Sequence, residues 1–290
     1  MKSLTQTGAG APLLDTHIHL DRYSLSDQEA IVADIRHSEV QSIISVSMDL
    51  ASCKRNLELS RLYGTMVRAA FGYHPEQPVP SSAETKALLD WMEEHADDMI
   101  AVGEVGLPYY AKLEAESEGR SWDNRPYEYL LEQFILFAKK HHKPVILHAV
   151  YEDAETACRL LEKYGVTRAH FHWFKGSRDT LLRMAGNGYY ISFTPDILYE
   201  DEIREIARLY PDHLVMTETD GPWPFEGPFA GQMTHPRMTS AVAAAWAELQ
   251  GGIRACGAGA VIRECRSLIR TIRKAIHTPS RLFKQSACSL

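Results

Sequence analysis

The chain has 290 residues, of which 45% are hydrophobic and 24% charged, and its formal net charge is −7. This length exceeds that of an average domain, but α/β barrels of about 250 residues are regularly single domains. The acidic balance argues against a protein that follows duplex nucleic acid along a basic surface. No uncharged apolar run approaches the roughly 18 residues of a membrane-spanning helix.

The termini and the cysteines narrow the class further. Residues 1–12 (MKSLTQTGAGAP) lack the apolar core of a signal peptide and are expected to form a flexible leader. The five cysteines are scattered without a CxxC pair, which favours reduced thiols over disulfides or a thiolate zinc site. We therefore expect a cytoplasmic protein that needs neither a membrane nor an obligate protein partner.

Short apolar runs alternate with helical patterns from residue 13 to residue 250. Strands are predicted at 13–18, 41–47, 66–73, 99–104, 144–148, 168–173, 188–193 and 213–218. Helices are predicted at 26–38, 52–63, 82–97, 124–142, 152–164, 177–186 and 200–209, with N-caps at Ser26 for the first and at Ser81 or Ser82 for the third. This alternation predicts a (β/α)₈ TIM barrel. An open doubly wound sheet is the alternative, but no GxGxxG follows the first strand.

The first predicted strand runs into two histidines, His17 and His19. Alternate side chains of a strand point to the same side, so both imidazoles can reach one metal ion. Neutral imidazole is a common ligand for divalent transition metals. The alternative is a pair of unrelated polar residues at a strand end.

Four later apolar runs also end in a potential ligand. A buried strand end with an unpaired charge costs several kcal/mol, so a cation that collects these groups explains the pattern. Four histidines and two carboxylates exceed the roughly three protein ligands of a mononuclear catalytic zinc, which favours two metals sharing a carboxylate. Core histidines or a loop hydrogen bond are the alternatives for single members. The later candidates are Glu104, His148, His172 and Asp220.

Six segments, in order, resemble the TatD family of metal-dependent hydrolases, within the amidohydrolase superfamily: DTHIHLD, GYHPEQ, GEVGLPYY, VILHAVYEDA, FHWFKG and ETDGPW. The resemblance implies a barrel with its metal site at the C-terminal ends of the strands. It implies two catalytic roles, Glu104 as the bridge between metals and Asp220 as a ligand that also orients or deprotonates the water. The implied metal ligands are His17, His19, Glu104, His148, His172 and Asp220.

Several residues are candidate substrate contacts near the metals. The resemblance makes His74 a phosphate-contacting histidine, although a plain loop histidine is the alternative. Lys175 can meet a phosphate or face solvent, and Trp223 can form an aromatic wall with Trp173 and Phe174. The chain also departs from the family. GLP replaces the usual GLD after the glutamate, and no arginine follows the fifth-strand histidine in HAVYE.

These residues favour a divalent-metal-dependent phosphodiesterase, a TatD-type deoxyribonuclease that acts on DNA ends through a metal-activated water. An amidohydrolase-type enzyme for a small ester, lactone or amide is the alternative, because the family arginine is missing. A non-catalytic metal-binding barrel is a third interpretation. The expected cofactors are two divalent ions, Zn, Mn or Ni and more weakly Mg. The expected partners are single-stranded DNA ends or a small molecule.

Residues 251–290 differ in composition from the barrel at 13–250. They hold eight Lys or Arg and one acidic residue, which leaves the preceding residues with a net charge of −14. This atypical basic tail is either a true helix at about 261–276 or a frame-shifted terminus that does not pack, and the abrupt shift at Gly251 favours the second interpretation.

Overall fold

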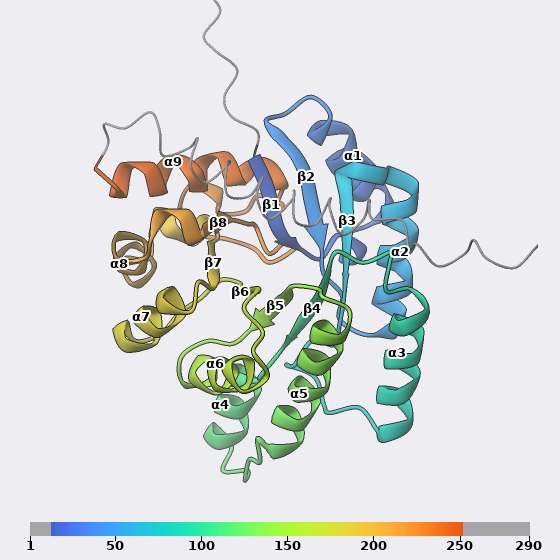
Figure 1. Cartoon of the computed structure of the whole chain (residues 1–290). Helices are drawn as coiled ribbons and strands as arrows, with labels where there is room; N and C mark the ends of the chain where they lie inside the picture. Colours follow the sequence, from blue (N-terminus) through green and yellow to red (C-terminus); the bar gives the residue numbers. More distant parts are fainter. Residues whose placement is uncertain (1–12, 252–290) are drawn as a thin grey trace, which may run out of the picture.

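A computed structural model describes residues 13–251 and shows eight parallel strands in the order β1 to β8. The sheet curves into a nearly closed barrel, with the helices on its outside (Figure 1). The predicted (β/α)₈ barrel is thus confirmed. The strands are β1 (Leu13–Ile18), β2 (Val40–Ser45), β3 (Val67–Phe71), β4 (Ala101–Gly106), β5 (Val145–His148), β6 (Ala169–Phe171), β7 (Tyr190–Phe193) and β8 (Val215–Thr217).

Nine α-helices lie within the described residues, and seven of them match predicted segments. These are α1 (Leu25–Ile35), α2 (Leu50–Tyr63), α3 (Ser82–Glu94), α5 (Arg125–Lys140), α6 (Glu152–Tyr164), α7 (Arg178–Gly186) and α8 (Asp201–Leu209). The sequence did not predict α4 (Tyr109–Ser117), which begins directly after β4, or the alanine-rich α9 (Thr239–Leu249). The expected leader at 1–12 and the tail from residue 252 onward lie outside the described residues.

The caps of two helices show where the predictions hold. The predicted cap Ser26 is wrong: Ser24 is the N-cap of α1, and its side chain accepts a hydrogen bond from Asp27 N. The helix already begins at Leu25, so the capping residue must stand before it. Ser81 caps α3 as predicted and forms a capping box with Glu84.

Threonine side chains link the first strand to the last. Thr16 Oγ1 donates to Thr217 O at 3.0 Å, and Thr217 Oγ1 donates to Leu14 O at 3.0 Å. Beyond the strand ends, the backbone N–H of Asp220 donates to His17 O at 2.8 Å. The closure of the barrel therefore places Asp220 beside the histidines of β1.

Glycines allow β4 to approach β5 closely. A Cβ on Gly106 would lie 1.8 Å from His148 O, and one on Gly103 would lie 2.7 Å from Ile146 Cβ. Any larger residue at these positions would push the two strands apart. Because Glu104 stands between these glycines, the close approach brings its carboxylate toward His148.

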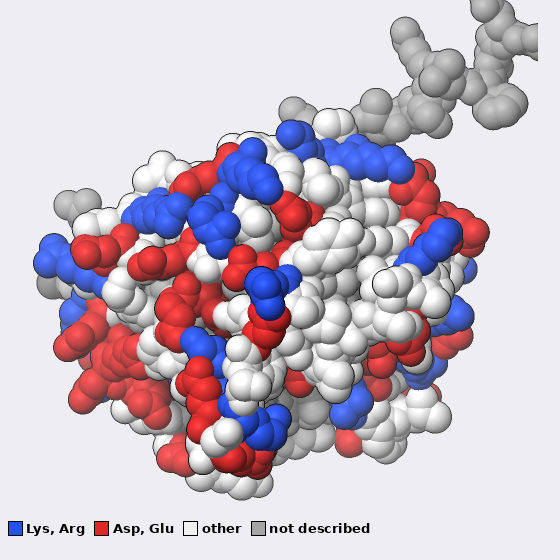
Figure 2. All heavy atoms as spheres, turned by 90° about the horizontal axis from the view of Figure 1, so that it is seen from below, with Lys and Arg blue, Asp and Glu red and all other residues white. Residues whose placement is uncertain are grey.

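Within residues 13–251, no helix is both long and apolar enough to cross a membrane. On the face drawn in Figure 2, Lys and Arg are interspersed with Asp and Glu. Interspersed charges of both signs are typical of an ordinary solvated surface.

Candidate metal centre

The structure brings all six predicted metal ligands together at the C-terminal ends of five strands. His17 and Glu104 are fully buried, and the other four are buried or nearly so. The donors come from β1, β4, β5, the segment after β6 and the segment after β8. TIM-barrel active sites lie at this end of the strands. The residues are His17, His19, Glu104, His148, His172 and Asp220.

The two carboxylate oxygens of Glu104 face different histidine pairs. Oε2 lies 3.1 Å from His17 Nε2 and 3.2 Å from His19 Nε2. Oε1 lies 3.1 Å from His148 Nδ1 and 2.7 Å from His172 Nε2. One carboxylate is thus shared between two groups of imidazole nitrogens, which is the arrangement that a bridging ligand requires.

Asp220 completes the first of these groups. Its Oδ1 lies 3.3 Å from His17 Nε2 and 3.6 Å from His19 Nε2. This oxygen is buried and has no hydrogen-bond partner among residues 13–251. A buried carboxylate oxygen without a donor is costly, and a cation would satisfy it. The residues present therefore fit a metal.

The electrostatics of the cluster also favour a cation. Burial and His172 lower the pKa of His17, but Glu104 and Asp220 outweigh them and raise it to about 9. Burial likewise opposes the charge on His172, yet Glu104 holds its pKa well above the usual range. Although burial would raise it, the surrounding histidines keep the pKa of Glu104 well below its usual value. The carboxylates thus create a potential that attracts positive charge, which bound divalent ions would also satisfy.

His74 lies in the same cluster but differs in its protonation. Its Nε2 is 3.5 Å from Glu104 Oε1. Burial lowers its pKa to about 4, although Glu104 acts in the opposite direction. His74 is therefore a neutral imidazole beside the predicted ligands, which suits a hydrogen bond to substrate.

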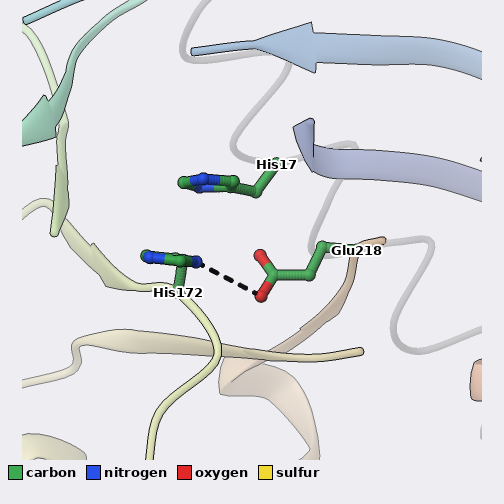
Figure 3. Close-up of side chains that lie close together, drawn as sticks. All are labelled: His17, His172 and Glu218. Carbon is green, nitrogen blue, oxygen red and sulfur yellow. Dashed lines mark ion pairs between the residues drawn. The ribbon is translucent and has the colours of Figure 1, made fainter. Parts of the chain in front are cut away.

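Glu218 lies beside His17 and His172 and was not predicted from the sequence. Figure 3 shows its carboxylate next to the ring of His172, which stacks on the ring of His17 with a centroid distance of 3.8 Å. Glu218 Oε1 is 3.6 Å from His172 Nδ1 and accepts a hydrogen bond from Trp173 N at 2.7 Å. Glu218 therefore holds the His172 loop, and its position in a buried strand end, one residue from Thr217, was the signal that could have identified it.

His170 lies on the far side of Glu218. Its Nε2 is 2.6 Å from Ser192 Oγ, and that hydroxyl donates to Glu218 Oε2 at 2.6 Å. Burial holds the pKa of His170 well below its usual value, so the ring is neutral. His170 thus supports Glu218 and lies outside the groups of side chains that could hold a metal.

Glu76 was also not identified from the sequence. Its Oε1 lies 3.0 Å from His148 Nε2. The same carboxylate accepts hydrogen bonds from Tyr110 N and Ala111 N at the first turn of α4. The Glu in the GYHPEQ segment was visible, but only the unpredicted α4 shows why a carboxylate is needed there.

A cleft of about 1260 Å³ opens above the cluster. Its lining includes the predicted substrate contacts His74, Lys175 and Trp223, and also Trp173. The interpretation of Phe174 as part of the aromatic wall is wrong: the ring is fully buried and packs against Phe171. Lys175 is the one Lys or Arg among the described residues that line the cleft.

Unusual backbone geometry is concentrated at this mouth. Four non-glycine residues within 13–251 have positive φ, and three of them, Tyr151, Trp173 and Asp220, lie two or three residues beyond the ends of β5, β6 and β8. Asp220 has φ of 47°. Such conformations cost of order 1–3 kcal/mol and persist where the surrounding structure fixes them, commonly at functional sites.

A barrel of this design, with imidazoles and carboxylates at its strand ends, defines the class of metal-dependent hydrolases. The model of the TatD-related DNase family matches residues 14–265, so the chain belongs to the TatD family. The resemblance inferred from the six sequence segments is thereby confirmed, and the protein is a metal-dependent hydrolase of this family.

Individual relatives support this assignment. An uncharacterized metal-dependent hydrolase of Haemophilus influenzae is 42% identical over 215 residues, covering 74% of this chain and 83% of its own length. Human deoxyribonuclease TATDN3 is 24% identical over 222 residues, covering 74% and 79%. The crystal structure of YJJV, a TatD homologue from Escherichia coli, superposes with a TM-score of 0.74 at 26% identity, covering 88% of this chain and 97% of that one.

Proposed function

We propose that this protein is a divalent-metal-dependent phosphodiesterase that removes nucleotides from DNA ends. The observation that carries the proposal is the division of the Glu104 oxygens between two histidine pairs. Two-metal centres of this kind stabilise both the attacking and the leaving oxygen of a phosphoryl transfer. The name of human deoxyribonuclease TATDN3 supports the choice of DNA as substrate.

The donor set would hold two metal ions that share Glu104. His17, His19 and Asp220 would bind one ion, and His148 and His172 would bind the other. Mixed imidazole and carboxylate donors suit Zn, Mn or Ni better than Mg, which prefers oxygen. When bound, such ions lower the pKa of a water toward neutrality and polarise the scissile group.

The residues around this centre supply the proton transfer and the positioning. Asp220 is ionised, because contact with His17 lowers its pKa although burial raises it. It can accept the proton of the attacking water and return it to the leaving group. The neutral His74 and the basic Lys175 line the cleft and would contact the phosphate.

Hydrolysis of a small ester, lactone or amide is the second candidate. It is favoured by the lining of the cleft beside β5, where Val150 occupies the region in which the family's arginine is expected. The described lining therefore offers a phosphate one basic side chain, Lys175, rather than two.

A substrate panel tests the two candidates. The metal-free protein is loaded with Zn, Mn, Ni or Mg and assayed with 5′- and 3′-labelled oligonucleotides, an aryl ester, a lactone and an amide. We expect stepwise shortening of single-stranded DNA, and no activity in the His17→Ala, His19→Ala double variant. Hydrolysis of the lactone or ester without cleavage of any oligonucleotide would select the second candidate.

A further inference from the structure

The mouth of the cleft has two walls that lie on opposite sides of the barrel. One wall is α4, which follows β4, and the other is the segment 223–226, which follows β8. In a sheet ordered β1 to β8, strands four positions apart lie across the barrel from each other. Figure 1 shows this separation of β4 and β8. A molecule bound above Glu104 must therefore lie between these walls.

Both walls expose large apolar side chains. Trp223 is 58% exposed, Tyr110 47% and Leu113 43%. Trp223 does not stand alone, since its ring centroid lies 6.0 Å from that of Trp173, which in turn lies 5.6 Å from that of Phe225. Trp223 is thus an exposed ring that packs on the half-buried Trp173, with the buried Phe225 behind it. An exposed aromatic ring held in this way beside a catalytic centre indicates a binding surface for a planar group.

The charge around these aromatic walls is mostly negative. The exposed carboxylates of Glu114, Glu200 and Glu226 line the cleft, and none forms an ion pair with another residue in 13–251. The single lining cation, Lys175, lies 5.2 Å from the centroid of the Trp173 ring. A continuing chain of phosphates would meet these carboxylates, whereas one phosphate at the metals would not.

We propose that the cleft prefers short phosphodiesters in which the base of a terminal nucleoside lies against Trp223. The carboxylates at the mouth disfavour a long polyanionic strand. This inference rests on the proposed cleavage at DNA ends and specifies which substrates are preferred: mono- and dinucleotide esters should be cleaved better than long strands.

The stacking part is tested with two esters that share one leaving group. Thymidine 5′-(p-nitrophenyl phosphate) carries a planar base, and methyl p-nitrophenyl phosphate does not. Loss of a stacking aromatic typically weakens binding about five- to a hundredfold, so Trp223→Ala should lower kcat/KM for the nucleotide ester by that factor. The same substitution should leave kcat/KM for the methyl ester unchanged, and Trp223→Phe should retain most of the activity toward the nucleotide ester.

Tyr129→Ala is the control, because it removes an aromatic side chain that is 65% exposed and lies outside the cleft.

A binding measurement complements these rates. Titration of the metal-loaded protein with dTMP should quench tryptophan fluorescence, and the Trp223→Phe variant should lose part of that quenching. Equal effects of Trp223→Ala on both esters, with unchanged quenching, would overturn the stacking part.

The charge part is tested by length. The parent protein should cleave dithymidylate with a higher kcat/KM than decathymidylate. The double variant Glu200→Lys, Glu226→Lys should raise the value for the decamer about tenfold at low salt, with the gain lost at high salt because exposed charges are screened. The control Glu29→Lys, Glu94→Lys makes the same change of charge at exposed positions outside the cleft.

The outcomes separate this inference from the proposed function. If no phosphodiester of any length is cleaved, the phosphodiesterase function is wrong. If phosphodiesters are cleaved but the decamer is as good a substrate as the dimer, and both double variants behave alike, only the preference for short substrates is wrong.

Discussion

Glu76 Oε1 lies 3.0 Å from His148 Nε2, so the carboxylate that caps α4 also holds a predicted metal ligand. Burial raises the pKa of Glu76, but His148 and the backbone N–H groups of α4 outweigh it and lower the value. With a metal bound, the ionised carboxylate would accept a hydrogen bond from Nε2–H of His148, which would leave the Nδ1 lone pair available to the ion. A partner on the second nitrogen is the usual way in which a ligating histidine is oriented.

Removal of this carboxylate should weaken metal binding. We expect Glu76→Ala to lower the affinity of the site about 10–100-fold, the usual effect of losing such an orienting group. Glu76→Gln should have a smaller effect, because its amide oxygen can still accept from Nε2. Competition with a chromogenic chelator measures the affinity, with Glu114→Ala as the control from the same cleft. Unchanged affinity in Glu76→Ala would show that His148 is oriented without it.

The six predicted ligands should bind up to two divalent ions for each chain. The double variant His17→Ala, His19→Ala removes two donors from one position and should lose at least one equivalent of metal. Elemental analysis after dialysis measures the content, and His213→Ala, an exposed histidine on the surface, is the control. Undiminished metal in the double variant would contradict the ligand assignment.

Asp220→Asn should separate metal binding from catalysis. The amide still offers an oxygen to the metal but cannot accept a proton, so turnover should fall about 10²–10⁴-fold, as expected for loss of a general base. Metal content and kcat are measured on the same preparation. Turnover near that of the parent protein would move the base elsewhere, with Glu104 and His74 as the nearest candidates.

The sequence predicted the barrel and the ligand positions well because both depend on local patterns. Each strand is a short apolar run. A carboxylate such as Glu104 at the end of such a run is costly to bury, so it stands out in the sequence as a residue with a function. The contacts of Glu76 and Glu218 were not predictable in this way. Glu76 and His148 are 72 residues apart in the sequence, and Glu218 and Trp173 are 45 residues apart. Both partnerships depend on which strand ends adjoin in the closed barrel.

The unpredicted α4 shows a second limit. It follows Leu107 and Pro108 directly and is only nine residues long, so the strand signal and the proline obscured its start. Isolated helices of this length are marginal and depend on tertiary contacts. Here those contacts include the Glu76 carboxylate at its first turn. The wall of the cleft therefore could not be predicted before the site was known.

Asp153 should make the stability of the metal-free protein depend on pH. Burial raises the pKa of its carboxyl from 3.8 to about 6, and its Oδ2 has no hydrogen-bond partner among the described residues. Between these values the folded state binds more protons than the unfolded state, so stability falls as pH rises. Asp153→Asn removes this loss and should stabilise the protein by about 2–3 kcal/mol at pH 7, but very little at pH 4.

Urea unfolding at both pH values measures this difference. Glu152→Gln is the control. Contact with Lys112 lowers the pKa of Glu152 against the opposing effect of burial, so this substitution should destabilise the protein at pH 7 rather than stabilise it. A gain in Asp153→Asn that is equal at pH 4 and pH 7 would refute the explanation by titration.

The last prediction concerns the missing arginine. Val150 lines the cleft with 4% exposure, and the next residue, Tyr151, donates its backbone N–H to Lys175 O at 2.7 Å. A guanidinium at position 150 would therefore enter the cleft near Lys175 and supply the bidentate donors that suit a phosphate. If phosphodiesters are the substrates, Val150→Arg should raise their turnover without changing the metal content.

The larger side chain carries a cost that the experiment must separate from the effect of charge. Overpacking at a buried position typically destabilises by about 1–3 kcal/mol, so the melting temperature of the variant is measured together with its turnover. Val150→Met adds length without charge and is the matched control. A gain in Val150→Arg alone, larger for a phosphodiester than for a carboxylic ester, would assign the substrate preference to the cation. Equal turnover of both esters in the three proteins would show that position 150 does not contact the phosphate.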